Sequence, residues 1–134
     1  MNKFQQDIAD RVRAQGEAVQ KALCLSDWHV KWEWHPSLMG SEEGADMEAS
    51  TATCATKALW KYRTVTFHVY LATAGTASDE TLFFVMVHEW VHVITSGLFP
   101  YLKSGQHVDD IIERITEDIT RTLMAALQLD LPED

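Results

Sequence analysis

The sequence predicts a single α+β domain over residues 1–134, and three observations support this expectation. Apolar residues recur at helical spacing near both ends of the chain, internal segments alternate apolar with polar residues as strands do, and a long apolar helix follows the strands. The chain has 134 residues, of which 46% are hydrophobic. A chain of this length and composition can bury a core without a disulfide framework.

Two amphipathic helices are predicted, over residues 3–24 and 106–129, because each segment carries one apolar stripe among polar residues. In the second of them, the small residues Thr116 and Thr120 lie beside the stripe and are expected to allow close approach to a neighbouring helix. The stripes are Phe4, Ile8, Val12, Val19 and Leu23 in the first helix and Val108, Ile112, Ile115, Ile119 and Leu123 in the second.

A third helix, over residues 79–94, is apolar on nearly every side, which predicts burial on most of its faces. Ser78 or Thr76 can cap its start, where two acidic residues follow, and Gly97 marks its end. Burying a polar side chain costs free energy unless it has a partner, so the few polar side chains of such a helix are expected to bind a common partner or to have a function.

Strands are predicted over residues 28–34 and 65–71 from their alternation, and more weakly over residues 51–56. The segments 51–56 and 65–71 are expected to pair as a hairpin that turns near residues 59–61. The stretch 37–47 is expected to be a solvated loop, and residues 72–77 are expected to form a second loop. One face of the first strand is interpreted as core and not as a ligand-stacking surface; it carries Trp28, Val30, Trp32 and Trp34.

Charge and cysteine content narrow the possible partners. The formal net charge is -9 and the 11 basic residues are scattered, so nucleic acid is not expected as a partner. Cys24 and Cys54 form no CxxC pair, which favours free thiols in a reducing compartment over a metal clip, with a disulfide between them as the alternative. No apolar stretch is long enough to cross a bilayer and no secretory segment opens the chain, so we expect no membrane association and a cytoplasmic location.

The motif that indicates chemistry lies in the apolar helix and reads His88-Glu89-Trp90-Val91-His92. Histidines four residues apart share one face of an α-helix, so both imidazoles can bind a single Zn²⁺. Glu89 lies beside that position and is the candidate general base. The alternative is a pair of core histidines, but this would place three polar groups in an apolar helix without a common partner.

A catalytic zinc site needs a third protein ligand. The Gly and His of the metzincin pattern do not follow His92, whereas the last helix supplies Glu113 on the flank of its apolar stripe and Glu117 more nearly opposite the stripe. We prefer Glu113 as the ligand, with Glu117 as a supporting carboxylate or an alternative ligand. For both glutamates the competing interpretation is a solvated helix face paired with Arg114 and Arg121.

Further site candidates are chosen by residue type alone. His107 and Asp109 are weaker ligand candidates in the last helix. A donor for the oxyanion of an acyl-transfer reaction could be Tyr101, His107 or His68.

On these residues the chain resembles the minigluzincins, small single-domain gluzincin-type metallopeptidases, and related HExxH proteins of bacteria and phages. The resemblance rests on the HExxH motif, on the downstream stretch Glu113-Arg114-Ile115-Thr116-Glu117 and on the preceding strand Tyr62-Arg63-Thr64-Val65-Thr66-Phe67, and covers about residues 28–127. It implies a zincin-like fold, with an N-terminal helix, a small mostly antiparallel three-stranded sheet, the zinc helix and a C-terminal glutamate helix.

The resemblance also implies roles for individual residues. His88, His92 and Glu113 would bind the zinc ion, Glu89 would be the general base, and Glu117 would take the place of a supporting acid that is often Asp in the family.

We therefore expect a zinc-dependent metallopeptidase that acts on a peptide or protein substrate. The resemblance implies that the strand near residues 65–71 is the upper rim of the cleft, where an extended peptide would add as an antiparallel strand. The alternative is a zinc-bound, non-catalytic protein of zincin fold that regulates or binds a partner, in line with the acidic composition and the missing second subdomain of larger gluzincins. The DNA-associated SprT proteases share HExxH, but the net charge of -9 disfavours that relation.

Overall fold

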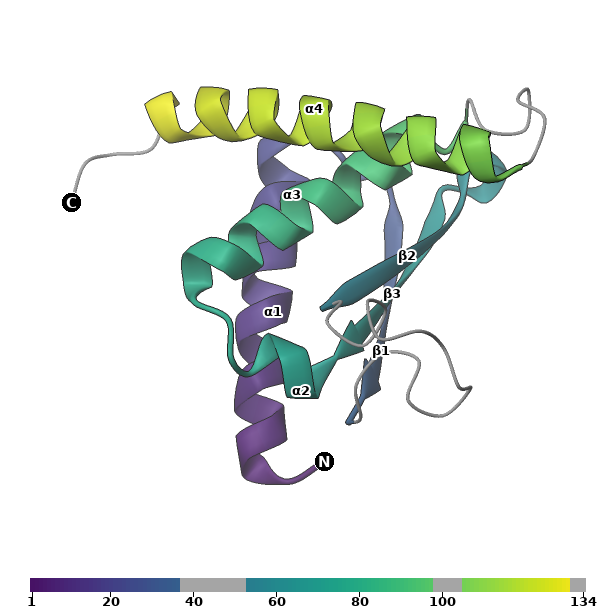
Figure 1. The fold of residues 1–134 in the computed structure, drawn as a ribbon. Coiled ribbons are helices and arrows are strands. Elements are labelled where there is room, and N and C mark those ends of the chain that lie inside the picture. Colours follow the sequence, from purple (N-terminus) through teal and green to yellow (C-terminus); the bar gives the residue numbers. More distant parts are fainter. Residues whose placement is uncertain (37–52, 98–104, 131–134) are drawn as a thin grey trace.

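The computed structural model of the chain describes residues 1–36, 53–97 and 105–130 (Figure 1). The three predicted long helices and three predicted strands are present, with bounds within a few residues of those expected. The predicted loop 37–47 lies outside the described residues. In chain order the elements are α1 (Lys3–Ala22), β1 (His29–His35), β2 (Cys54–Leu59), η2 (Trp60–Tyr62), β3 (Thr64–Tyr70), α2 (Leu71–Ala74), α3 (Asp79–Thr95) and α4 (Gln106–Asp130).

The short helix α2 occupies part of the predicted loop 72–77. Its two apolar ends, Leu71 and Ala74, are buried in the core, and the backbone N–H of Gly75 donates to the carbonyl of Leu71 at 2.9 Å. This single helical turn therefore buries two apolar side chains and pairs the carbonyl of Leu71.

The sheet is mixed, with the strand order β1-β3-β2. The predicted hairpin of β2 and β3 is confirmed as an antiparallel pair, but β1 pairs with β3 in parallel, in the register Trp32 opposite Phe67. The expectation of a mostly antiparallel sheet is therefore wrong, because one of its two pairings is parallel. The chain passes through β2 before it returns beside β1, and this crossover lets β1 and β3 run in the same direction.

One face of the sheet forms the core with α1 and α3. Along β3, Val65, Phe67 and Val69 are buried while the residues between them are only partly buried. The ring of Phe67 contacts Trp90 of α3 edge to face, at 5.1 Å between centroids, and Trp32 of β1 at the same separation. The interpretation of the tryptophan-rich face of the first strand as core is confirmed: Trp28 is buried, and Val30, Trp32 and Trp34 pack partly buried against the core.

Helix α1 lies close to both the sheet and α3 at Gly16. A Cβ atom at this position would lie 2.5 Å from Cη2 of Trp32 and 3.2 Å from Cε of Met86, so only glycine fits without a shift. The indole N–H of Trp90 donates to the carbonyl of Gly16 at 3.0 Å. This contact joins α1 to α3 across 74 positions of sequence.

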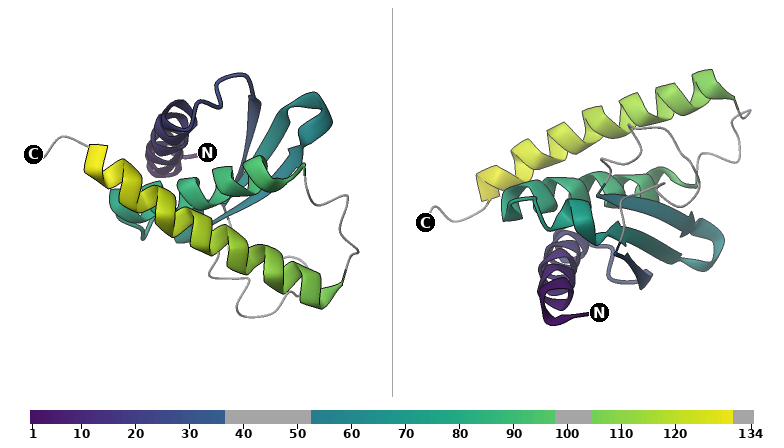
Figure 2. Two further views of the ribbon diagram at one scale, coloured as in Figure 1. Left: turned by 90° about the horizontal axis from the view of Figure 1, so that it is seen from above. Right: turned by 60° about the horizontal axis from the view of Figure 1, so that its bottom comes forward.

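Helix α3 is the central element, and it packs against α1, β2 and α4 (Figure 2). Ser78 is its N-cap, and the Ser78 hydroxyl accepts from the backbone N–H of Thr81 at 3.1 Å. The predicted burial of this helix on most faces is confirmed, since its buried residues are Leu82, Met86, Val87, Glu89, Trp90, Val91, Val93 and Thr95.

Helix α4 crosses α3, and its contact face is centred on Thr116 and Thr120, which are 1% and 0% exposed. Their hydroxyls donate to carbonyls one turn earlier, at 2.8 and 2.7 Å, so burial leaves neither hydroxyl unpaired. The expected close approach through these two residues is confirmed. The expected stripe is wrong at Ile115, which is 49% exposed, because the small threonines lie where the backbones come closest.

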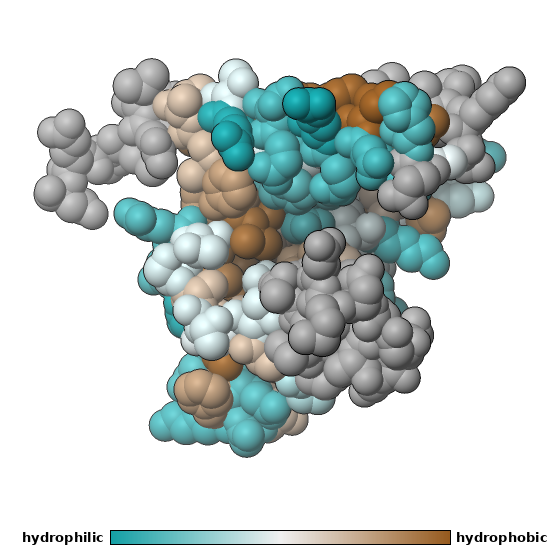
Figure 3. All heavy atoms as spheres, in the orientation of Figure 1, coloured by the Kyte–Doolittle hydropathy of each residue, from teal (hydrophilic) through white to brown (hydrophobic). Residues whose placement is uncertain are grey.

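The outward surface of α4 is mainly hydrophilic, as the teal residues along the top of Figure 3 show, with a hydrophobic patch toward its N-terminal end. Ile111 and Ile115 are exposed on this part of the helix.

In the described part of the chain no helix combines the length and the apolar character that crossing a membrane requires. Both cysteines are free thiols, Cys24 at the surface and Cys54 in the core.

Candidate metal centre

Helix α3 places both histidines of the HExxH motif on the side that faces α4. His88 and His92 are one helical turn apart, and their Nε2 atoms lie 3.1 Å from each other. Both side chains are largely buried, with 13% and 18% exposure. The two imidazoles thus direct one nitrogen each at a common point.

Helix α4 supplies the third potential ligand, Glu113. Its Oε1 atom lies 3.0 Å from Nε2 of His92, and its Oε2 atom lies 3.6 Å from Nε2 of His88. Ligand atoms of these three residues all lie within 4.8 Å of one another. Glu113 reaches this position because the buried threonines of α4 bring that helix close to α3.

Glu117 lies one turn further along α4 and contacts the same histidine from its other side. Its Oε1 atom is 2.8 Å from Nδ1 of His88. The expectation that Glu117 points away from the contact face is wrong, because that face is centred on the threonines and not on Ile115. A proton on Nδ1 that is donated to Glu117 leaves the lone pair of His88 Nε2 directed at His92 and Glu113.

The donor set fits a divalent cation better than it fits hydrogen bonds alone. The Nε2 atom of His92 lies near both His88 Nε2 and a Glu113 oxygen, and one proton on this nitrogen can be directed at only one of them. A cation at the meeting point would satisfy all three lone pairs together. Two imidazole nitrogens and a carboxylate are a common ligand set for zinc.

Glu89 is buried beside this centre, with 6% exposure. The hydroxyl of Thr56, on β2, donates to its carboxylate. Burial raises the pKa of Glu89 from its ordinary value of 4.5 to about 8, against the lowering effect of the Thr56 hydrogen bond, and the charge of Glu113 adds to the rise. A carboxyl group with a pKa near neutrality can both take up and release a proton at neutral pH.

Burial also acts on His92, whose pKa is lowered from its ordinary value of 6.5. Desolvation is the main cause, and the Glu113 carboxylate opposes it. The lowered pKa favours the neutral imidazole, which is the form that binds a metal ion.

An open pocket of about 990 Å³ lies in front of these residues. One wall is β2, and the others come from α3 and α4. Among the described strands β2 is an edge strand, because it pairs with β3 only. The expectation that the strand near residues 65–71 forms the rim is therefore wrong: β3 is the central strand, hydrogen-bonded on both sides, and β2 borders the pocket instead.

Two residues that line the pocket, Thr56 and Cys54, were not expected at the site. The period of two along β2 could have indicated them, because it places both side chains on the sheet face that packs against α3. Their pairing partners on β3, Phe67 and Val69, lie on the same face. Burial, with a contribution from the charge of Glu89, raises the pKa of the Cys54 thiol well above its ordinary value, so this thiol stays protonated.

The other candidates are not brought to the pocket. His68 lies on the sheet face opposite α3, and His107 is exposed near the start of α4. Neither His107 nor Asp109 is among the residues that line the pocket. Tyr101 lies outside the described residues.

Comparison of the chain with models of protein families, with curated proteins and with solved structures gave no match.

Proposed function

We propose that this chain is a zinc-dependent metallopeptidase in which His88, His92 and Glu113 bind the ion and Glu89 is the general base. One observation carries the proposal: three ligand atoms meet within 4.8 Å at the wall of an open pocket that also holds a buried carboxyl group with a raised pKa. A zinc ion bound there supplies a Lewis acid for the scissile carbonyl and the attacking water.

The protein side chains perform the proton transfers. Glu89 takes a proton from the attacking water and delivers it to the leaving nitrogen. With a pKa of about 8 the carboxyl group acts as the base through its ionised fraction, and once protonated it is a ready proton donor at neutral pH. Thr56 holds the Glu89 carboxylate by its hydroxyl. Glu117 fixes the orientation of His88 through Nδ1.

An extended peptide would bind along the outer edge of β2. This edge borders the pocket over residues 53–58, and among the described strands none pairs with it on that side. An edge strand presents unpaired backbone N–H and C=O groups, to which a peptide can add as a further strand. The scissile bond would then lie between β2 and the metal-binding helix.

The test is cleavage of a quenched fluorescent peptide library by wild type and Glu89→Gln, with zinc content measured on the same samples. Glu89→Gln is expected to keep the zinc that depends on His88 and His92 and to lose at least about 100-fold in cleavage rate. The matched control is Glu80→Gln, an exposed glutamate in the first turn of the same helix.

Equal cleavage by wild type and Glu89→Gln would remove Glu89 as the base. Zinc at the motif with no cleavage by wild type would instead favour a zinc-bound, non-catalytic protein.

A further inference from the structure

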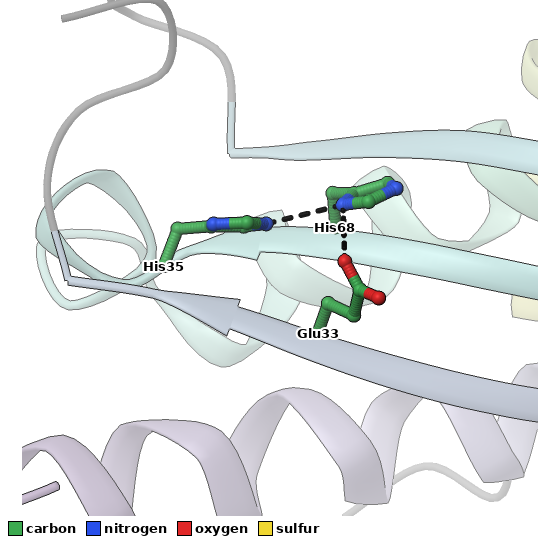
Figure 4. A group of neighbouring side chains, drawn as sticks. All are labelled: Glu33, His35 and His68. Atoms are coloured by element: carbon green, nitrogen blue, oxygen red, sulfur yellow. Dashed lines mark hydrogen bonds and ion pairs between the residues drawn. The ribbon is translucent and has the colours of Figure 1, made fainter. Parts of the chain in front are cut away.

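A second group of potential metal ligands lies on the opposite face of the sheet from α3. Glu33 and His35 project from β1, and His68 projects from β3 (Figure 4). In the parallel register Glu33 lies opposite His68, and His35 is two residues further along the same face. The three residues, here called the outer cluster, come from the two strands that pair in parallel.

The distances within the outer cluster match those around a metal ion. Nε2 of His35 and Oε2 of Glu33 each lie 3.1 Å from Nδ1 of His68. Ligand atoms of the three residues all lie within 4.8 Å of one another. In a tetrahedral zinc site with bonds of about 2.0 to 2.1 Å, neighbouring ligand atoms lie about 3.3 Å apart.

Hydrogen bonds alone do not satisfy this arrangement. If Nδ1 of His68 carries a proton and donates it to Glu33, that proton is not directed at His35. If His35 donates instead, the lone pairs of Nδ1 and of the carboxylate face each other. A cation between the three atoms would bind all of these lone pairs at once.

Neighbouring groups hold the cluster in place. The ring of His35 stacks on Tyr70 at 5.1 Å and on His68 at 5.3 Å between centroids, which limits its rotation. The Nζ atom of Lys31 lies 3.3 Å from Oε1 of Glu33, which leaves Oε2 for the cluster. His68 and Glu33 are 28% and 38% exposed, so an ion could enter from solvent.

We propose that the outer cluster is a second binding site for a divalent transition-metal ion such as Zn²⁺. Two imidazoles and one carboxylate are the donor types that zinc, copper and nickel prefer, and the three residues would supply three of the four positions of a tetrahedral site. The ion would join β1 to β3. The outer cluster shares no residue with the HExxH centre, so the two proposals stand or fall separately.

The experiment uses the variant His88→Ala/His92→Ala, in which the HExxH centre is removed. Zinc binding to this variant is titrated in competition with a chromophoric chelator, and folding is checked by circular dichroism. One Zn²⁺ per chain is expected, and its affinity is expected to fall at least about tenfold when His35→Ala or His68→Ala is added.

The matched control is His29→Ala on the same background, because His29 is exposed on β1, on the same face of the sheet, but outside the cluster. It is expected to leave the affinity unchanged. The proposal is overturned if the background variant binds no zinc, or if its zinc affinity is unaffected by His35→Ala and by His68→Ala. Loss of peptidase activity in the background variant bears only on the HExxH centre.

Discussion

The two faces of the sheet carry similar ligand sets in very different surroundings. Each combines two histidines with a glutamate, and in each two ligand nitrogens lie 3.1 Å apart. The HExxH centre is built from two helices, borders a pocket and has the buried Glu89 beside it. The outer cluster is built from two strands, and Lys31 forms an ion pair with its glutamate. The ligand set alone would therefore support metal binding on either face, whereas the proposed hydrolysis also needs the buried carboxyl group and the pocket.

The largest expected effect separates the two sites by activity. His88→Ala should lower kcat/KM for a cleaved peptide by at least about 1,000-fold, because it removes a ligand of the proposed catalytic ion. His35→Ala should change kcat/KM by less than about threefold, since it acts on the opposite face. Steady-state kinetics on both variants measures the contrast. If His35→Ala abolished cleavage as well, the separation of the two faces would fail.

The second effect concerns the stability of the metal-free chain. The folded state holds a proton on Glu89 up to a pKa of about 8, whereas the unfolded state releases it near the ordinary value of 4.5. This contribution to stability is complete below pH 4.5 and is lost as the pH rises through about 8. The free energy of unfolding should therefore fall by about 1.4 kcal/mol per pH unit between pH 5 and 8 from this group.

Urea unfolding of wild type and Glu89→Gln in excess chelator, at several pH values, tests this expectation. The slope should be shallower in Glu89→Gln. Parallel slopes would mean that Glu89 is ionised in the folded chain.

The third effect tests the support that Glu117 gives to His88. Glu117→Gln should weaken zinc binding at the HExxH centre about 10- to 100-fold, because it replaces the carboxylate that accepts from Nδ1. Zinc binding at the outer cluster should not change. Asp118→Asn, an exposed neighbour on α4, is the control. Equal affinities for Glu117→Gln and the control would show that His88 needs no such partner.

The smallest effect belongs to the outer cluster. Lys31→Ala removes a positive charge that pairs with Glu33, and it should strengthen zinc binding there about two- to fivefold at low ionic strength. The gain should shrink in 0.5 M salt, where the Debye length is only about 4 Å and the charge of this exposed lysine is largely screened. A weaker affinity in Lys31→Ala would mean that the lysine orients Glu33 more than it repels the ion.

The sequence predicts the fold best where the signal is local. Helical and strand periodicities gave all long elements, and the burial of α3 followed from its apolar composition. The parallel pairing of β1 with β3 was not accessible, because it depends on where the chain returns after β2. The predicted contact face of α4 was wrong at Ile115 for a related reason. Close packing of two helices requires small residues, so Thr116 and Thr120 are buried in the contact and the larger Ile115 is exposed.

The candidate site divides in the same way. The spacing of His88 and His92 is visible in the sequence, and Glu113 was found because it lies on the flank of a helical stripe. Thr56 reaches Glu89 only through the packing of β2 on α3. The outer cluster depends on strand register, which brings His68 beside two residues that precede it by more than thirty positions.

Gly16 makes the HExxH centre sensitive to a residue that has no functional group. Helix propensity favours alanine over glycine by roughly 1 kcal/mol, whereas the packing around residue 16 leaves room only for glycine. A methyl group there would clash with the ring of Trp32. The resulting shift would strain the hydrogen bond from the indole N–H of Trp90, the residue after Glu89, to the carbonyl of residue 16. In a mutational scan selected for activity, substitutions at Gly16 should therefore be depleted alongside those in the motif, and a list of essential positions would include one that touches neither metal nor substrate.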